Sequence, residues 1–386
     1  MHICHVTSSL KGGPIFIIGQ LVDAQLRSGH QVSLVFSNAR DDEAEARAWF
    51  PPNVRLFPWH ALREIDIAQD TKAYFHLSAV LRELRPDILH AHNSKAGALG
   101  RIAAKRHGLP VIYSPHGLAY LQDNVAATKR AVFFAMEWGL ALFCEMITAS
   151  SKSEMSALRW LPCRKSLVNN GMNVPELEAA ASGEPAVPRS RRFRIVVCGR
   201  IDPQKSPSLV AKIAAQSPSD WEWVWVGEGA LRPVLEECGR ITITGWLPRQ
   251  KSLATIRSAD VYLQASGWEG MSIALLEAMA LGRPCVVSGA VGNRDLVRTL
   301  ESGFVCRNEV DYLSALSTLE HDQVLRARLG SGAAETIEKH FSQAAVIRAW
   351  SAAYRRVLRN RISAFSGFAS AETLAGKAGL QAAINS

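Results

Sequence analysis

Two glutamates, Glu269 and Glu277, have a spacing that suits the binding of an extended, doubly substituted ligand. The segment 259–284 predicts a strand, a glycine-bearing turn and a helix over 271–282 that is capped by Gly282. Eight residues span about 12 Å along a helix, which fits the distance from sugar to ribose across a diphosphate. The helix N-terminus would offer N–H groups to phosphates or sugar hydroxyls. The alternative is two solvated charges, but the neighbours of Glu277 are apolar, and an unpartnered carboxylate among them would be costly.

Two cations, Arg200 and Lys205, follow a second predicted strand and precede a helix. Ligands of α/β folds bind at the carboxyl ends of such strands. A planar guanidinium fork and a point charge five residues apart could hold a diphosphate without a metal. Two isolated basic residues would not by themselves indicate a binding site. Their position between a strand and a helix is the reason to predict that they bind a diphosphate.

The first strand and a later one end in further candidate residues. Gly12 and Gly13 let the backbone approach a ligand and open a helix, although a Gly-Gly pair is also a common turn. His116 stands before Gly117 at the end of another strand and could project into a cleft. A lone histidine is more often structural.

Several familiar motifs are absent from the sequence. It contains no Gly-x-Gly-x-x-Gly, no P-loop, no esterase elbow and no Asp-x-Asp pair, so support for nicotinamide binding, P-loop chemistry, esterase chemistry and a diphosphate-bound metal is lost. His90 and His92 alternate along one strand and could suggest a metal. Without a third ligand in the sequence, strand-end packing or a substrate contact is the favoured interpretation.

These residues must be positioned by alternating strands and helices, which predict parallel sheets covered on both faces. The 386 residues suggest about two domains, with a boundary in the Pro-rich, non-periodic segment 175–192. A helix over 344–362 would bury one face, and the tail beyond it is weakly periodic. The expected strands are 2–8, 31–37, 87–92, 110–116, 146–151, 193–200, 221–227, 241–246, 259–266 and 284–289. The buried face of the C-terminal helix would carry Ile347, Trp350, Tyr354, Val357 and Leu358.

Composition predicts a globular cytoplasmic protein. Hydrophobic residues make up 48% of the chain, and seven scattered cysteines contain no Cys-x-x-Cys pair, so reduced thiols are expected rather than disulfides or zinc. The N-terminus does not have the pattern of a secretory signal. The apolar segment 131–144 is too short to span a membrane, and a buried helix is expected there.

The net charge of +9 comes mainly from the second half of the chain. It could reflect attraction to an anionic surface or simply solvated faces, whereas nucleic acid is disfavoured because no matching motif accompanies the charge. Two stretches carry many of the arginines: Arg189, Arg191, Arg192 and Arg194, then Arg348, Arg355, Arg356, Arg359 and Arg361.

Over residues 1–360 the sequence resembles the retaining glycosyltransferases of family four (glycosyl transferases group 1). The most specific elements are the two glutamates separated by seven residues in WEGMSIALLEAMALGRP and the GR-x4-K pattern of Arg200 and Lys205, and the KGGP and SPHG segments also fit. The segment HAHNSKAGALGRIAAKRHGLPVIYSPHG is similar to the bacterial surface-polysaccharide subgroup. The chain departs from the family at Asn293, Arg294 and Asp295, where a Gly-rich turn with Pro-Glu is usual.

The resemblance implies a GT-B fold, in which two Rossmann-like domains face across a cleft. The expected parts are an acceptor domain over 1–175, a linker over 176–192, a donor domain over 193–345, a crossing helix over 346–362 and a tail over 363–386. The crossing helix would bring both arginine groups into one basic patch at the inner membrane leaflet.

The resemblance also assigns roles to the residues. Arg200 and Lys205 would bind the diphosphate in place of a metal, Glu277 would hold the ribose, and Glu269 would grip the donor sugar together with the backbone of Gly270, Met271 and Ser272. Gly13, with Gly12, would approach the phosphate, and His116 would hydrogen-bond near the 6-hydroxyl of the sugar. The segment 244–248, with Gly245 and Leu247, would contact the base.

The implied activity is retaining transfer of a sugar from a nucleotide sugar, with UDP as the expected nucleotide. The acceptor would be a lipid-linked saccharide in the biosynthesis of bacterial lipopolysaccharide, capsule or exopolysaccharide. Neither a metal nor another cofactor is expected, and the protein would be cytoplasmic or peripheral on the inner membrane face. Two alternatives remain open: a GT-B sugar-nucleotide 2-epimerase, which would need further carboxylates in the first domain, and a non-catalytic nucleotide-sugar-binding scaffold.

Overall fold

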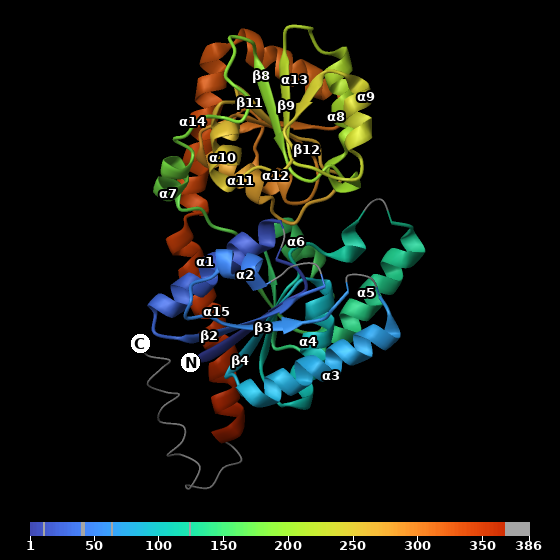
Figure 1. The fold of residues 1–386 in the computed structure, drawn as a ribbon, viewed down its shortest axis with the longest axis vertical. Helices are drawn as coiled ribbons and strands as arrows, with labels where there is room; N and C mark the ends of the chain where they lie inside the picture. Colours follow the sequence, from blue (N-terminus) through green and yellow to red (C-terminus); the bar gives the residue numbers. More distant parts are fainter. Residues whose placement is uncertain (11, 40–42, 63–64, 123–124, 367–386) are drawn as a thin grey trace.

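The computed structural model describes residues 1–386 except 11, 40–42, 63–64, 123–124 and 367–386. Within these residues the chain forms two lobes, each built on a parallel sheet (Figure 1). The first sheet has the strand order β3-β2-β1-β4-β5-β6-β7 and the second β10-β9-β8-β11-β12-β13. The predicted α/β architecture of two parallel sheets is therefore confirmed.

The first sheet contains β1 (His2–Thr7), β2 (Gln31–Ser37), β3 (Arg55–Trp59), β4 (Ile88–His92), β5 (Val111–Ser114), β6 (Met146–Ala149) and β7 (Arg164–Leu167). Its connections carry α1 (Gly13–Arg27), α2 (Glu43–Trp49), α3 (Ile67–Leu84), α4 (Ser94–Arg106), the short 3-10 helix η1 (Ala119–Leu121), α5 (Ala127–Ala141) and α6 (Lys152–Ala157). Helix α7 (Val174–Ala180) follows and overlaps the start of the segment 176–192 that was expected to be a linker.

The second sheet contains β8 (Arg194–Cys198), β9 (Glu222–Val226), β10 (Ile241–Ile243), β11 (Val261–Gln264), β12 (Cys285–Ser288) and β13 (Gly303–Cys306). Its helices are η2 (Pro203–Lys205), α8 (Pro207–Gln216), α9 (Arg232–Cys238), α10 (Arg249–Arg257), α11 (Ile273–Ala280), α12 (Asn293–Leu296), α13 (Glu309–His321), α14 (Gln323–His340) and α15 (Gln343–Ser366). The ten predicted strands are all present, while β3, β7 and β13 are additional.

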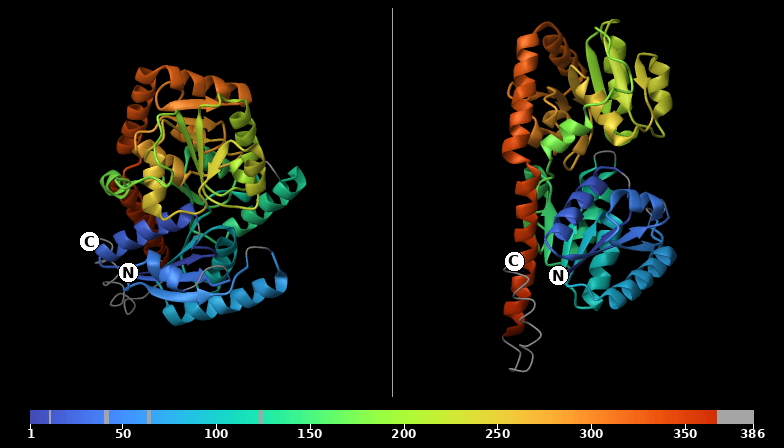
Figure 2. Two further views of the ribbon diagram at one scale, coloured as in Figure 1. Left: turned by 45° about the horizontal axis from the view of Figure 1, so that its top comes forward. Right: turned by 60° about the vertical axis from the view of Figure 1, so that its left-hand side comes forward.

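Helix α15 leaves the second lobe and runs along the first, as the right-hand view of Figure 2 shows. Trp350, Tyr354, Val357 and Leu358 are buried, and they pack in one cluster with apolar residues of β1, β4, β5 and β6. Val346 is buried too, whereas Ile347 is only half-buried, so the packed face begins one residue earlier than predicted. The predicted tail beyond residue 366 lies outside the described residues.

The chain crosses between the two lobes at two points that are bonded to each other. Met172, on the outward crossing, forms a parallel bridge with Ser342, on the return crossing. The Met172 N–H donates to the carbonyl of Phe341 at 2.8 Å, and the Gln343 N–H donates to the carbonyl of Met172 at 3.0 Å. A Cβ on Gly171 would lie 2.9 Å from the side chain of Val346, so the two crossings are closely packed.

The prediction of a buried helix over 131–144 is wrong. In α5 only Ala141 is buried, and the helix projects from the first lobe (Figure 1). Val132, Met136 and Trp138 of α5, and Leu142 and Phe143 directly after it, have exposed side chains, whereas Phe134 packs against Tyr120 and the core of the first lobe. Among the described residues no helix has the length and apolar character needed to cross a membrane.

The prediction of a single basic patch is also wrong. Arg194 is fully buried and paired with Glu222 at 2.7 Å, and Arg189 is paired with Asp260 at 2.7 Å, so both are held on the second lobe at the start of β8. Arg355 and Arg359 lie on the part of α15 that packs against the first lobe. The side chain of Arg361 lies outside the described residues.

Candidate active site

Lys205 and Glu269 form the centre of the site, at the carboxyl ends of the adjacent strands β8 and β11. The Lys205 Nζ lies 2.6 Å from Glu269 Oε1, which also accepts a hydrogen bond from Ser266 Oγ at 2.9 Å. Gln204 Nε2 donates to the other oxygen, Oε2, at 3.3 Å and to the Trp268 carbonyl at 3.1 Å. Three side chains therefore hold one carboxylate, and both partners of the ion pair are largely buried.

The turn after β8 places Lys205 by means of a close backbone approach. Gly199 has φ 148°, and a Cβ there would lie 2.7 Å from Lys205 Cε, so the lysine stem passes directly over the glycine. Asp202 caps the short helix η2 by accepting from the Lys205 N–H at 3.3 Å. A side chain at position 199 would displace the lysine stem, which explains the need for glycine.

Arg200 lies beside this pair but does not contact it. Its guanidinium pairs with Asp202 at 3.3 Å and donates to Gln204 Oε1 at 3.3 Å. The side chain is 48% exposed, so Gln204 separates the arginine from the ion pair of Lys205 and Glu269. The two predicted cations are thus near each other, one exposed and one buried.

Glu277 is buried on α11 and has a partner that the sequence did not reveal. Arg249, the first residue of α10, donates to Glu277 Oε1 at 2.5 Å and stacks its guanidinium 4.0 Å from the ring centre of Phe16. Burial raises the pKa of the Glu277 carboxyl, while Arg249 lowers it. Since Phe16 belongs to α1, this buried charge sits at the boundary of the two lobes.

The start of α11 contributes backbone and side-chain groups next to Glu269. Ser272 caps the helix: its Oγ accepts from the Leu275 N–H at 3.4 Å and donates to Gln264 Oε1 at 2.8 Å. The Met271 carbonyl accepts from Asn170 Nδ2, on the first lobe, at 3.2 Å. The positive end of the α11 dipole therefore lies at the junction of the lobes.

The start of α1 faces the start of α11 across this junction. Gly12, with φ 84°, caps α1, and a Cβ on Gly13 would lie 2.8 Å from Ile273 Cγ1. Only a residue without a side chain fits at position 13 in this arrangement. Two helix N-termini thus converge, which favours an anion between them.

His116 lies on the first lobe opposite Gly270. It has φ 53°, and its Nε2 lies 3.0 Å from His92 Nδ1. Burial lowers the pKa of His116 to about 4, so the ring is neutral at pH 7. A Cβ on Gly270 would lie 3.3 Å from the backbone nitrogen of Gly117, so the loops bearing His116 and Glu269 meet closely.

The segment 244–248 follows β10 on the same edge of the second sheet. Gly245 has φ 70°, and its carbonyl accepts from the Gly227 N–H at 3.0 Å. Leu247 is half-buried against the core, whereas the Trp246 side chain is exposed. Because α10 starts directly after this segment, Arg249 connects it to Glu277.

The residues that depart from the family pattern join the two lobes. Both carboxylate oxygens of Asp295 accept hydrogen bonds from Ser153, one from its N–H at 2.7 Å and one from its hydroxyl at 2.8 Å. Asn293 is buried, with its amide oxygen 2.6 Å from Gln264 Nε2. The departure is therefore part of the contact between the lobes.

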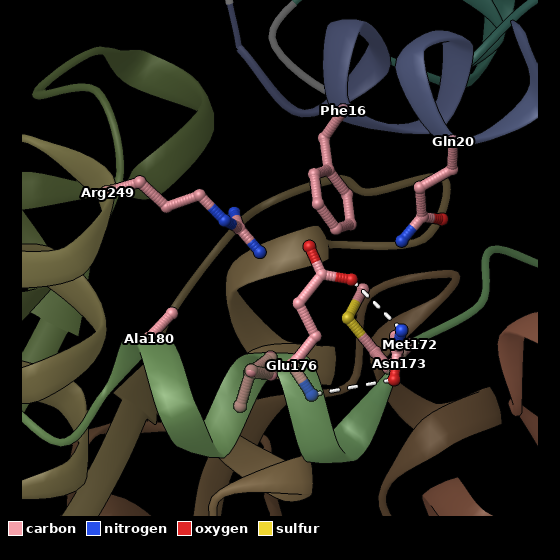
Figure 3. A pocket seen from close by; sticks show the side chains of 8 residues that line it. Phe16, Gln20, Met172, Asn173, Glu176, Ala180 and Arg249 are labelled. Carbon is pink, nitrogen blue, oxygen red and sulfur yellow. Dashed lines mark hydrogen bonds between the residues drawn. The ribbon is translucent and has the colours of Figure 1, made fainter. Parts of the chain in front are cut away.

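A small pocket lies beside Arg249, between α1, α7 and α10. In Figure 3 Phe16 and Gln20 of α1 point toward Arg249 and toward Glu176 of α7. None of the predicted site residues lines it. The pocket therefore adjoins the ion pair of Arg249 and Glu277 rather than the cluster around Lys205.

Each lobe matches a model of a known protein family. Residues 12–169 match a family model described as a glycosyl transferase 4-like domain, and residues 192–322 match one described as glycosyl transferases group 1.

Two kinds of relative agree with these matches. An Escherichia coli UDP-Gal:alpha-D-GlcNAc-diphosphoundecaprenol alpha-1,3-galactosyltransferase is 30% identical over 303 residues, which cover 72% of this chain and 76% of the relative. Sucrose-phosphate synthase from Thermosynechococcus elongatus superimposes with a TM-score of 0.80 at 18% identity, over 93% of this chain and all of that one. Anabaena HepE in complex with UDP and glucose gives a TM-score of 0.75 at 17% identity, over 92% and 99% of the two chains. The chain belongs to the GT-B glycosyltransferases of family four, the glycosyl transferases group 1, in a subgroup related to bacterial polysaccharide synthesis.

Proposed function

We propose that this glycosyltransferase moves a sugar, with retention of configuration, from a UDP-sugar to a lipid-linked saccharide during the assembly of a bacterial cell-surface polysaccharide. The ion pair of Lys205 and Glu269, on the second lobe where its loops meet the first, is the observation that carries this proposal. The E. coli relative, whose name specifies a UDP-sugar donor and a diphosphoundecaprenol-linked acceptor, supports the donor and acceptor classes.

The donor would lie across the converging starts of α1 and α11. Lys205 and Arg200 would bind the diphosphate, and Gly13 would let backbone approach it. A bound phosphate would replace Glu269 as the ion-pair partner of Lys205. The Glu269 carboxylate could then accept hydrogen bonds from the sugar hydroxyls, while Ser266 continues to orient it. Glu277 would hold the ribose by exchanging its bond with Arg249 for the ribose hydroxyls.

Transfer would then proceed on one face of the sugar. The bond between the anomeric carbon and the diphosphate oxygen breaks, and the acceptor oxygen bonds to the same face of that carbon. The leaving phosphate takes the acceptor proton, so no separate base is needed. Lys205 and Arg200 would stabilise the charge that develops on the diphosphate, the point at which fixed cations contribute most. We propose that these cations replace a metal.

The acceptor side of the proposal rests on the exposed face of α5. Val132 and Met136, one turn apart on the same face, would enter the interfacial region of a membrane, and Lys129 near the start of the helix would meet anionic headgroups. Flotation with phosphatidylglycerol vesicles tests this, because Val132→Ser should weaken binding while Val324→Ser, at an exposed apolar position on the other lobe, should not. Equal binding of both variants would count against a membrane role for α5.

A donor panel tests the reaction itself. The purified protein is incubated with UDP-, GDP- and ADP-sugars, a membrane extract and EDTA, and nucleotide diphosphate release is followed. Release from a UDP-sugar that depends on the extract and is insensitive to EDTA is the expected result. Loss of activity with EDTA would refute metal independence, and interconversion of a UDP-sugar without release would refute transfer in favour of epimerisation.

A further inference from the structure

Behind His116 the first lobe contains a chain of buried polar side chains that links the site to α15. His116 Nε2 lies 3.0 Å from His92 Nδ1, and His92 Nε2 lies 2.9 Å from His5 Nδ1. His5 Nε2 lies 2.8 Å from Gln25 Oε1, and Gln25 Nε2 donates to the Tyr354 hydroxyl at 3.0 Å. Five side chains from β1, β4, α1, α15 and the loop after β5 therefore form one continuous path.

The path continues beyond the tyrosine to a backbone carbonyl. The Tyr354 hydroxyl lies 2.7 Å from His90 Nδ1, and His90 Nε2 lies 2.8 Å from Ser114 Oγ. Ser114 Oγ lies 2.6 Å from Thr148 Oγ1, which donates to the carbonyl of Tyr113 at 3.4 Å. Because a carbonyl only accepts hydrogen bonds, this end of the path sets a direction.

The direction can be followed back through each group. Thr148 gives its one hydrogen to the carbonyl, so Ser114 must donate to Thr148 and accept from the Nε2–H of His90. Burial keeps the His90 ring neutral by lowering its pKa, and its Nδ1 therefore accepts the Tyr354 hydrogen. The Tyr354 oxygen is left to accept from Gln25, in agreement with the position of the amide nitrogen.

The same reasoning then reaches the site. Gln25 presents its amide oxygen to His5, which must carry its hydrogen on Nε2, and His5 Nδ1 accepts. His92 therefore donates from Nε2 to His5 and accepts at Nδ1 from the Nε2–H of His116. The remaining ring nitrogen of His116, Nδ1, has no hydrogen-bond partner within the described ranges, and it is left with a lone pair.

A metal site is the other interpretation of this cluster. The side chains of His5, His90 and His92 can bring one ligand atom each within 4.8 Å of one another. Each of the six ring nitrogens already has a hydrogen-bond partner, however. A metal would have to break several of these bonds, so the directed hydrogen-bond chain accounts better for the cluster.

We propose that His92 is a positioning residue that holds His116 as its Nε2–H tautomer, so that His116 presents Nδ1 as a hydrogen-bond acceptor to a hydroxyl of the donor sugar. The sugar contact rests on the proposed function, whereas the tautomer does not. The chain acts through geometry: His5, His90 and His92 each have both ring nitrogens bound, so moving the hydrogen of His116 to Nδ1 requires reversing every bond behind it.

Two substitutions of His92 separate this role from simple packing. In His92→Asn the amide oxygen takes the place of Nδ1, so the bond from His116 is kept and the bond to His5 is cut. In His92→Gln the longer amide takes the place of Nε2, so the bond to His5 is kept and the bond from His116 is cut. Each variant loses one buried hydrogen bond, and thermal unfolding checks that their stability losses match.

The turnover of the two variants decides the proposal in an active enzyme. His92→Asn should keep kcat/KM for the donor within about threefold of the wild type, and His92→Gln should lose about tenfold or more. Equal losses, or a larger loss in His92→Asn, would overturn the positioning role.

The tautomer itself is measured without any reaction. In the wild-type protein with ¹⁵N-labelled histidine, the His116 signals are identified by their absence in His116→Gln. A hydrogen on Nε2 and a bare Nδ1 are expected, and they should persist in His92→Asn. A hydrogen on Nδ1 in the wild type would overturn the proposal. This test also decides the matter if no donor is turned over or if a His92 variant fails to fold, so failure of the proposed function stays distinguishable.

Discussion

Removing the Arg249 guanidinium should expose how much the buried Glu277 depends on it. In the wild type Arg249 is the hydrogen-bond partner of a carboxyl that is only 7% exposed, and the arginine itself is 36% exposed. Arg249→Ala leaves Glu277 in the same apolar surroundings without its partner. The carboxyl must then either stay charged at a high cost or take up a proton.

The exposed fractions of Glu277 and Arg249 determine how much stability Arg249→Ala should lose. Breaking a fully buried ion pair costs about 3–5 kcal/mol, and a surface pair is worth about 0–1 kcal/mol. With one buried and one partly exposed partner, we expect a loss of about 2 kcal/mol near pH 7, which lies between these limits. About 0.5–1 kcal/mol of this comes from the stacking of Arg249 on Phe16, which does not depend on pH.

The loss should depend on pH because the pKa of Glu277 is already raised by burial in the folded protein. A raised folded-state pKa contributes stability that is present below the unfolded value and is lost as pH rises through the folded value. Arg249→Ala removes both influences that lower this pKa, so the folded value rises further. The difference between the variant and the wild type should therefore be largest at neutral pH and shrink toward the stacking contribution near pH 4.

Urea unfolding from pH 4 to pH 8, followed by circular dichroism, measures this. With a slope of about 2 kcal/mol/M, the midpoint at pH 7 should fall by about 1 M urea. Adding Glu277→Gln to Arg249→Ala should recover most of the loss. Arg232→Ala, which removes a surface arginine from its pairs with Glu228 and Glu236, is the matched control and should change little. A loss that is independent of pH, or absent, would refute the reasoning.

Three further substitutions test the site. Lys205→Ala should lower turnover by about 10²–10³-fold with folding intact, whereas Lys212→Ala, at an exposed lysine, should not; near-wild-type turnover of the former would remove Lys205 from the site. Gly13→Ala places a Cβ 2.8 Å from Ile273 Cγ1, an overpacking cost of about 1–3 kcal/mol, so the donor KM should rise roughly tenfold, and Ile273→Ala should reverse the rise. Asp295→Ala removes two hydrogen bonds between the lobes, so solution X-ray scattering should show a larger radius of gyration; an unchanged radius would mean that these bonds do not hold the lobes together.

The fold was readable where local pattern decides it. Apolar runs separated by helical stretches predict the strands correctly, because each strand of a parallel sheet is buried on both faces. Strands β3 and β7 were not predicted because charged residues, and in β3 a proline, interrupt their apolar residues. The segments RLFPW and RKSL lack the continuous apolar pattern of the other strands. The burial of α5 was predicted wrongly because the sequence shows which side chains are hydrophobic but does not show whether another element covers them.

The sequence identified individual residues of the site but not the side chains with which they interact. Glu277 was expected to have a partner, but Arg249 lies 28 positions away on another helix. His5 and His92 are 87 positions apart, and only the pairing of β1 with β4 brings their rings together. Such contacts depend on strand order, which the spacing of residues along one segment does not encode.

The bonded crossings at Met172 and Ser342 determine how this enzyme can open. Two lobes joined by a single chain segment can rotate and slide relative to each other. Here two segments cross between the lobes and hydrogen-bond to each other, so together they form a hinge. The lobes can turn about that line, yet they cannot shear past one another without breaking the bridge. A rotation about this line would open the far side of the molecule widest, and the reverse rotation would bring the start of α1 back against the start of α11 in the same register. A donor bound between the lobes would therefore meet groups of α1 and α11 that are already aligned with each other. This alignment comes from the two connections between the lobes.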